Sequence, residues 1–179
     1  MKFRFVAAIV ALILPVPAYA DCTDEACGSI QKILDARSGN FAKIKGKPTR
    51  DSRGDAVWEG TQPIAGLMTN CTINRRGEGA RYEYRCEAEA APSPEQAKKI
   101  ASLVKAAFKS AEPNIEWFED PAARSLSDIN GFAGTEGWYG GFPKNHTVAV
   151  KIETVVSGNF GGITAVTVFA KPLTRRDLR

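Results

Sequence analysis

A segment rich in glycine and aromatic residues, GFAGTEGWYGGFPK, runs from Gly131 to Lys144 and differs in composition from its surroundings. Aromatic side chains bury large areas with few rotatable bonds, and glycine-rich loops often carry them to a binding surface. The segment is therefore the best candidate for a ligand or partner site, and this interpretation predicts that Trp138 and Tyr139 are exposed. The competing interpretation, which carries more weight, is a lid whose rings fold back over the end of the core. The candidate binding residues are Phe132, Trp138, Tyr139 and Phe142.

The residues that could perform catalysis form no recognisable pattern. His146 is the only histidine, which excludes a metal site with two histidines, and its position at the start of a predicted strand favours a structural role. The chain has no GxSxG or HExxH motif, and its glycines match no phosphate-binding loop. Two acids could act together as in a glycosidase, but the sequence does not place them in space. We predict no catalytic residue, metal or cofactor; the acids considered are Glu116, Glu119, Asp120, Asp128, Glu136 and Glu153.

Cys71 and Cys86 stand at the ends of CTINRRGEGARYEYRC, which has alternating flanks and a glycine-rich middle. An antiparallel hairpin that sets these cysteines opposite each other also pairs Ile73 with Tyr84 and puts all four side chains on one face. The turn then falls in residues 77–80, where glycines supply the positive φ that tight turns need. We predict a structural disulfide between the two cysteines, worth about 3 kcal/mol in the chain-entropy model.

The other two cysteines, Cys22 and Cys27, pair with each other by elimination. Neither predicted pair has the two-residue spacing of a redox site or a zinc knuckle, so both are predicted to be structural.

Two helices are expected from the spacing of apolar residues. The first begins at Thr23, whose hydroxyl caps it, and ends at Gly39 in the left-handed conformation. The second begins at the capping residue Ser93, with Pro94 in the first helical position. Its buried stripe is predicted to be Ala97, Ile100, Ala101, Val104, Phe108 and Ala111, and its other face, which carries lysines, is predicted to be solvated.

Strands are predicted on either side of the second helix. Before it, short strands are expected at 41–46, 56–61 and 64–68, with a polar loop over 47–56, followed by the cysteine hairpin. After it, a short strand at 115–118 and an irregular stretch to Pro143 precede strands at 146–156 and 162–170, paired near Val155 and Thr164. The predicted fold class is α+β, an antiparallel sheet built from two hairpin regions with two helices packed on one face. The sequence shows no internal repeat.

The N-terminus has the pattern of a secretory signal peptide. Basic residues precede a ten-residue apolar run, two prolines break it, and Ala18-Tyr19-Ala20 offers a cleavage site after Ala20. A membrane span would need roughly 20 apolar residues, so no span is predicted. We expect residues 1–20 to be the signal peptide, residues 21–179 to form one domain, and the protein to be periplasmic or secreted, where disulfides persist.

The charge and the absence of a catalytic motif restrict the function. Cleavage after Ala20 removes two of the 24 basic residues and none of the 20 acidic ones, which lowers the net charge from +4 to +2. Such a balance predicts no nucleic-acid partner. We predict a non-catalytic protein that binds another protein or a cell-envelope component, for instance as an inhibitor or immunity-type partner. The alternatives are a cell-envelope hydrolase that uses paired carboxylates and a structural envelope component; the sequence does not determine the oligomeric state.

Overall fold

The computed structural model describes residues 24–50, 55–76, 81–120, 134–142, 147–157, 161–174 and 177. Over these ranges the chain forms an antiparallel sheet with two helices, α1 (Glu25–Ala36) and α2 (Pro94–Ala111), and two 3-10 turns, η1 (Arg37–Gly39) and η2 (Ala42–Ile44). The strands are β1 (Lys45–Arg50), β2 (Ala56–Gly60), β3 (Asn70–Arg76), β4 (Arg81–Glu87), β5 (Glu116–Glu119), β6 (Gly134–Phe142), β7 (Thr147–Ser157) and β8 (Gly161–Thr174). The predicted α+β class is confirmed. Residues 1–23, which include the expected signal peptide and Cys22, lie outside the described ranges.

The sheet consists of two four-stranded meanders joined through their last strands. Its order is β1-β2-β3-β4-β8-β7-β6-β5, and β4 pairs with β8 in the antiparallel sense. One helix precedes each meander, so a unit of one helix and four strands occurs twice in the chain. This repeat exists in the topology, whereas the sequence shows none.

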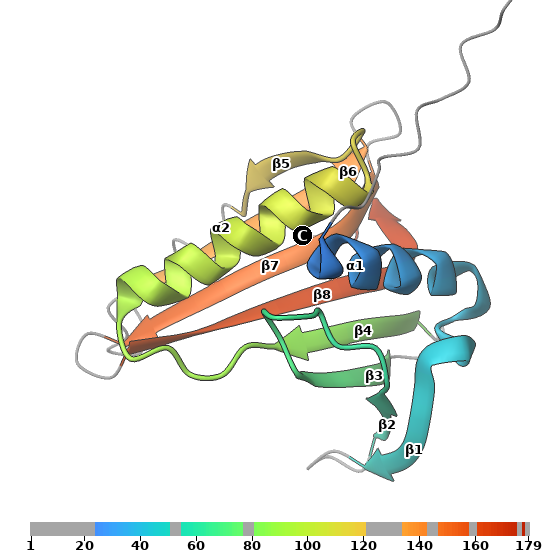
Figure 1. Ribbon diagram of the computed structural model, residues 1–179. Coiled ribbons are helices and arrows are strands. Elements are labelled where there is room, and N and C mark those ends of the chain that lie inside the picture. Colours follow the sequence, from blue (N-terminus) through green and yellow to red (C-terminus); the bar gives the residue numbers. More distant parts are fainter. Residues whose placement is uncertain are drawn as a thin grey trace, which may run out of the picture.

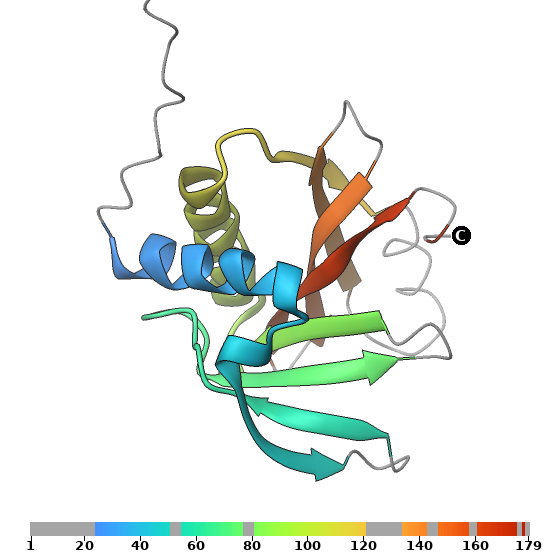
Figure 2. The same cartoon turned by 90° about the vertical axis from the view of Figure 1, so that its right-hand side faces the viewer.

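Both helices lie on the same side of the curved sheet, and α2 crosses β7 and β8 (Figures 1 and 2). We call the sheet face toward the helices the inner face and the opposite one the outer face. The main core lies between the helices and the inner face, where Ile73, Tyr84, Ile152 and Val166 are fully buried. Within the described ranges, neither helix combines the length and the apolar character that crossing a bilayer requires.

The predicted disulfide and the predicted register of the two strands that carry it are confirmed. Cys71 is paired with Cys86 and Ile73 with Tyr84 across β3 and β4, and the disulfide joins Cα atoms 4.1 Å apart. Both cysteines are buried on the inner face, so the bond is enclosed by the core. Residues 77–80, where the turn was expected, lie outside the described ranges.

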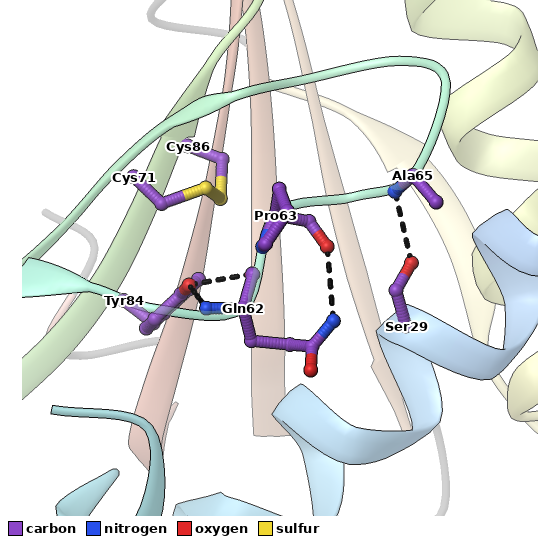
Figure 3. The surroundings of a disulfide bond; sticks show 7 residues. All are labelled: Ser29, Gln62, Pro63, Ala65, Cys71, Tyr84 and Cys86. Carbon is purple, nitrogen blue, oxygen red and sulfur yellow. Dashed lines mark hydrogen bonds between the residues drawn. A yellow bond between two sulfur atoms is a disulfide. The ribbon is translucent and has the colours of Figure 1, made fainter.

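Polar contacts beside the disulfide attach the segment before β3 to the sheet and to α1 (Figure 3). The Tyr84 hydroxyl donates to the Gln62 carbonyl at 2.6 Å and accepts from the Gln62 amide at 3.2 Å. The Ser29 hydroxyl in α1 accepts from the Ala65 amide at 3.1 Å. The strand expected at 64–68 is wrong, because Ile64 and Met68 bond to each other in a turn.

The start and end of α1 differ from the prediction. Asp24 is the cap, and its carboxylate accepts from the Cys27 amide. The left-handed residues after the helix are Asn40 and Phe41 rather than Gly39. Phe41 is fully buried, and the packing of its ring in the core stabilises the left-handed backbone conformation, which is more usual for glycine.

The position of β1, the first edge strand of the sheet, also differs from the prediction. In the segment 41–46, residues 42–44 form the turn η2 and only Lys45 and Gly46 belong to β1, which continues into the region that was expected to be a loop. Its exposed, polar residues show no alternation because β1 is an edge strand that buries neither face, and its strand structure comes from pairing with β2.

The second helix follows the prediction closely. The Ser93 hydroxyl accepts from the Gln96 amide at 3.3 Å, and Pro94 occupies the first helical position. The lysines on its other face are not simply solvated. Lys98 pairs with Glu136 at 2.6 Å, Lys109 donates to the Ile115 carbonyl at 2.7 Å, and Lys105 lies 4.1 Å from the Trp138 ring centroid. These contacts fasten α2 to the region of β5 and β6.

The second meander confirms the long strands and corrects the stretch before them. β7 and β8 form as predicted, with Val155 opposite Ile163, one residue from the expected partner. The stretch expected to be irregular contains β6, which pairs with β5 on one side and β7 on the other. The aromatic segment is thus, over residues 134–142, a strand inside the sheet rather than a loop.

Candidate functional site

The candidate aromatic residues are divided between the two faces of β6. Trp138 lies on the inner face, half-buried against the main core together with Phe142. Tyr139 lies on the outer face and is only 7% exposed, so the expected exposure of its ring is wrong. Phe132 lies outside the described ranges. The described residues of the segment therefore do not form one contact surface.

Glycines explain why this strand was not recognised from sequence. A Cβ on Gly140 would lie 2.7 Å from the Ile115 Cδ1 atom and 2.8 Å from the Trp117 ring. A Cβ on Gly141 would collide with the Thr147 carbonyl. The glycines allow rings and backbone from β5 and β7 to approach β6, and they remove the alternation of side chains that identifies a strand.

One row of side chains crosses the outer face at the level of Tyr139. Successive backbone partners along this row are Arg85 of β4, Thr167 of β8, Lys151 of β7, Tyr139 of β6 and Phe118 of β5. Neighbouring strands are about 4.8 Å apart, so each side chain adjoins the next. The row brings together two cations, a hydroxyl, a phenol and a partly exposed aromatic ring from five strands.

A groove of about 410 Å³ lies over this row on the outer face. We call Tyr139, Phe169, Leu173 and Thr167 its floor; the three apolar residues pack together with Val148 and are each at most 7% exposed, so the accessible lining of the groove is mainly polar. Its walls carry three cations and three carboxylates: Arg76, Arg85, Lys151, Glu83, Glu153 and Asp177.

At one end of the groove, Arg85, Glu153 and Lys151 belong to a continuous chain of ion pairs. Arg85 contacts Glu87 at 3.0 Å and Glu153 at 3.5 Å. Lys151 contacts Glu153 at 2.7 Å and Asp120 at 3.4 Å. Glu153 therefore lies between the two cations and links β4 to β7.

Two further ion pairs lie at the other end of the groove. Arg76 contacts Glu83 at 3.1 Å, and Arg81 contacts Asp177 at 3.6 Å. The Arg76 side chain is 62% exposed and the Glu83 side chain 15% exposed, so the cation is largely in contact with solvent and the acid is largely buried. Hydrogen bonds from the amide and hydroxyl of Thr174 hold Asp177 and lower its pKa.

Two groups of the row, the Tyr139 hydroxyl and the Lys151 ammonium, have pKa values above their ordinary values. Burial raises the pKa of the Tyr139 hydroxyl. Burial alone would lower the pKa of Lys151, but the hydrogen bond and charge of Glu153, with Tyr139 and Asp120 nearby, raise it overall. Both groups hold their protons at neutral pH and act as hydrogen-bond donors rather than as bases or nucleophiles.

Exposed apolar residues are also concentrated on this face. Among the described residues, the large apolar side chains with most exposure are Leu103, Phe118, Val155 and Ile163, between 37% and 48%. Phe118 belongs to the row described above, and Val155 and Ile163 are partners on the outer face of β7 and β8. Leu103 alone lies elsewhere, on α2.

Of the acids considered as catalytic candidates, the structure brings two together. Asp120 and Glu153 both contact the Lys151 ammonium on the outer face. Glu136 is bound to Lys98 on the inner face, while Asp128 and His146 lie outside the described ranges. Among the described residues, no cluster of three or more metal-ligating side chains is present.

Sequence reasoning missed most of the groove. Arg85, Lys151 and Phe169 come from different strands, and no local motif connects them. The available signal was the alternation of charged residues in β4 and β7, which is also typical of any solvated sheet face.

Comparisons with protein-family models, with curated protein sequences and with solved structures give no match to this chain.

Proposed function

We propose that the protein is an exported, non-catalytic binding protein. A signal peptide over residues 1–20 is cleaved after Ala20, and residues 21–179 form one domain. This domain binds another protein or a cell-envelope component in the periplasm or outside the cell. Export is supported by the oxidised state of the cysteines. Cys71 and Cys86 are joined, and Cys27 is also disulfide-bonded. Disulfides persist in oxidising compartments, and Cys22 is the remaining cysteine for Cys27.

The observation that carries the binding function is the groove on the outer face. Its volume of about 410 Å³ lies within the range of ligand sites, and charged side chains converge there over a small apolar cluster. Phe118, Val155 and Ile163 extend the apolar surface of the same face. An exposed apolar surface with a charged rim is typical of contact with a partner.

The chemistry of the groove supports recognition rather than turnover. Asp120 and Glu153 are the acids that a carboxylate-dependent hydrolase could use, but both are engaged by the Lys151 ammonium. Lys151 and Tyr139 have raised pKa values, which removes them as bases at neutral pH. The near balance of charge in the groove supports a partner of mixed charge and disfavours a nucleic acid.

A capture experiment with matched variants tests this proposal. The protein is purified from the exported fraction, N-terminal sequencing checks for a start at Asp21, and the immobilised protein is exposed to an envelope extract. Phe118→Asp, on the outer face, should abolish capture, whereas Leu103→Asp, on α2, should leave it unchanged. The two side chains have similar exposure, 39% and 46%, so the variants differ in the face they alter. Loss of capture with both variants or with neither contradicts the proposal.

A further inference from the structure

We propose that the outer-face groove binds a short free peptide, with an amino group, a carboxylate and one apolar side chain. This inference rests on the proposed binding function and specifies its ligand. The groove offers three cations, three carboxylates and an apolar floor. A zwitterion with an apolar side chain matches this balance, because it can contact a cation with one end and a carboxylate with the other, whereas a ligand with a single charge could contact only one kind of wall group.

The carboxylate of the peptide is assigned to the row between Arg85 and Lys151. Both residues are backbone partners of Thr167, which puts a hydroxyl between the two cations. Glu153 already shows that one carboxylate can reach both, with Oε2 at 3.5 Å from Arg85 Nη1 and Oε1 at 2.7 Å from Lys151 Nζ. The Arg85 guanidinium has five N–H donors and is engaged by Glu87 and Glu153, so it can serve a ligand carboxylate in addition, while Lys151, already engaged by Glu153, Asp120 and Tyr139, adds the attraction of its charge.

The amino group of the peptide is assigned to the end of the groove that holds Glu83 and Asp177. Glu83 is the backbone partner of Phe169, so its carboxylate adjoins the apolar floor. Its ion-pair partner Arg76 has a side chain that is 62% exposed, and the pair therefore has little to lose when a ligand amine replaces the arginine. Asp177 has a lowered pKa and offers a second ionised acceptor beside it.

The apolar side chain of the peptide is assigned to the floor between these two ends. Tyr139 and Phe169 present aromatic rings there, and Leu173 and Val148 pack beside them. The volume of about 410 Å³ lies at the small end of the usual range of ligand sites, which suits a few residues rather than a long segment.

Calorimetric titration of the exported, disulfide-bonded protein with the tripeptide Ala-Phe-Ala in three forms tests the inference. The unblocked peptide should bind, and acetylation of its amino group or amidation of its carboxylate should each weaken binding by about tenfold. Equal binding of the blocked and unblocked forms would show that an internal protein segment can occupy the groove, and it would overturn the inference. Absence of binding by all three forms would overturn it as well.

Two variants test which end of the groove binds the carboxylate of the peptide and which end binds its amino group. Arg85→Gln should remove the preference for the free carboxylate and leave the preference for the free amine, and Glu83→Gln should do the reverse. Lys99→Gln, on the exposed side of α2, is the matched control and should leave both preferences intact. Thermal unfolding of each variant checks that it is folded. If a variant does not fold, the comparison of the three peptide forms on the unaltered protein still tests the inference.

The inference and the proposed function fail in different ways. If no form of the tripeptide binds while Phe118→Asp still abolishes capture from the extract and Leu103→Asp does not, the groove face is a binding surface for another ligand. In that outcome the proposed function stands and the peptide assignment falls.

Discussion

Trp138 and Tyr139 are consecutive residues whose rings lie on opposite faces of the sheet. Trp138 packs against the main core under Lys105 of α2, while Tyr139 joins Phe169 in the floor of the outer groove. One short segment thus closes the core on one side and builds the candidate site on the other. Substitutions at the two positions should therefore have separable effects on stability and on binding.

Trp138→Ala should lower the free energy of unfolding by about 2 kcal/mol, less than the roughly 3–5 kcal/mol typical of a fully buried tryptophan, because the ring is half-buried. The loss combines apolar contact with the core and the interaction with Lys105. Urea unfolding measures the change, and capture from an envelope extract should remain as in the unaltered protein. Unaltered stability together with lost capture would show that Trp138 is the contact residue and would refute the division of the two faces.

Replacing both cysteines of the hairpin, Cys71→Ala with Cys86→Ala, should lower the free energy of unfolding by about 3 kcal/mol. The disulfide spans a sequence separation of 15 residues, and its loss frees that loop in the unfolded chain. The measurement is urea unfolding without reductant. A peptide map of the unreduced protein is the companion test, and a link from Cys71 to any cysteine other than Cys86 would contradict the structure.

Tyr84→Phe should cost about 1–3 kcal/mol, because the partly buried amide and carbonyl of Gln62 lose their hydrogen-bond partner. Burial raises the pKa of Tyr84 to about 12 from an unfolded value near 10. The folded state then holds a proton that the unfolded state releases, so this contribution is complete below pH 10 and is lost as the pH rises from 10 to 12. Unfolding measured from about pH 8 to 12 should show a steeper decline in the unaltered protein than in the variant; parallel curves would contradict the assignment.

A pair of glycine substitutions should act in opposite directions. Gly161 has φ +81°, and a Cβ there would collide with the Ala91 carbonyl oxygen, so Gly161→Ala should cost more than about 2 kcal/mol. Gly28 lies in α1, and a methyl group added there would meet no neighbouring atom within 4 Å, so Gly28→Ala should stabilise by about 0.5–1 kcal/mol. Thermal unfolding of both variants is the measurement, and a stabilising Gly161→Ala would refute the close approach of β8 to Ala91.

The cysteine hairpin and the second helix were predictable because their signals are local. Pairing Cys71 with Cys86 fixes the register of every residue between them, and Ser93 with Pro94 fixes the start of α2. The same reasoning failed for β6, where glycines replace the alternating side chains, and for β1, whose strand structure depends on pairing with β2.

The groove could not be predicted, because it depends on which strands become neighbours. Arg85 and Lys151 lie far apart in the chain, and both adjoin Thr167 only because β8 lies between β4 and β7. The sequence did supply Tyr139 as a candidate, but for an exposed loop rather than for the floor of a groove. The face of a strand residue follows from its register, and the register of β6 was not recognisable.

The most direct test of the binding face is photo-crosslinking in the compartment to which the protein is exported. A photoreactive phenylalanine analogue replaces Phe118 on the outer face in one sample and Leu103 on α2 in the other. Mass spectrometry of the irradiated protein should show a discrete adduct from position 118 and none from position 103. Adducts of equal yield from both positions, or an adduct from position 103 alone, would contradict the assignment of the outer face as the binding surface.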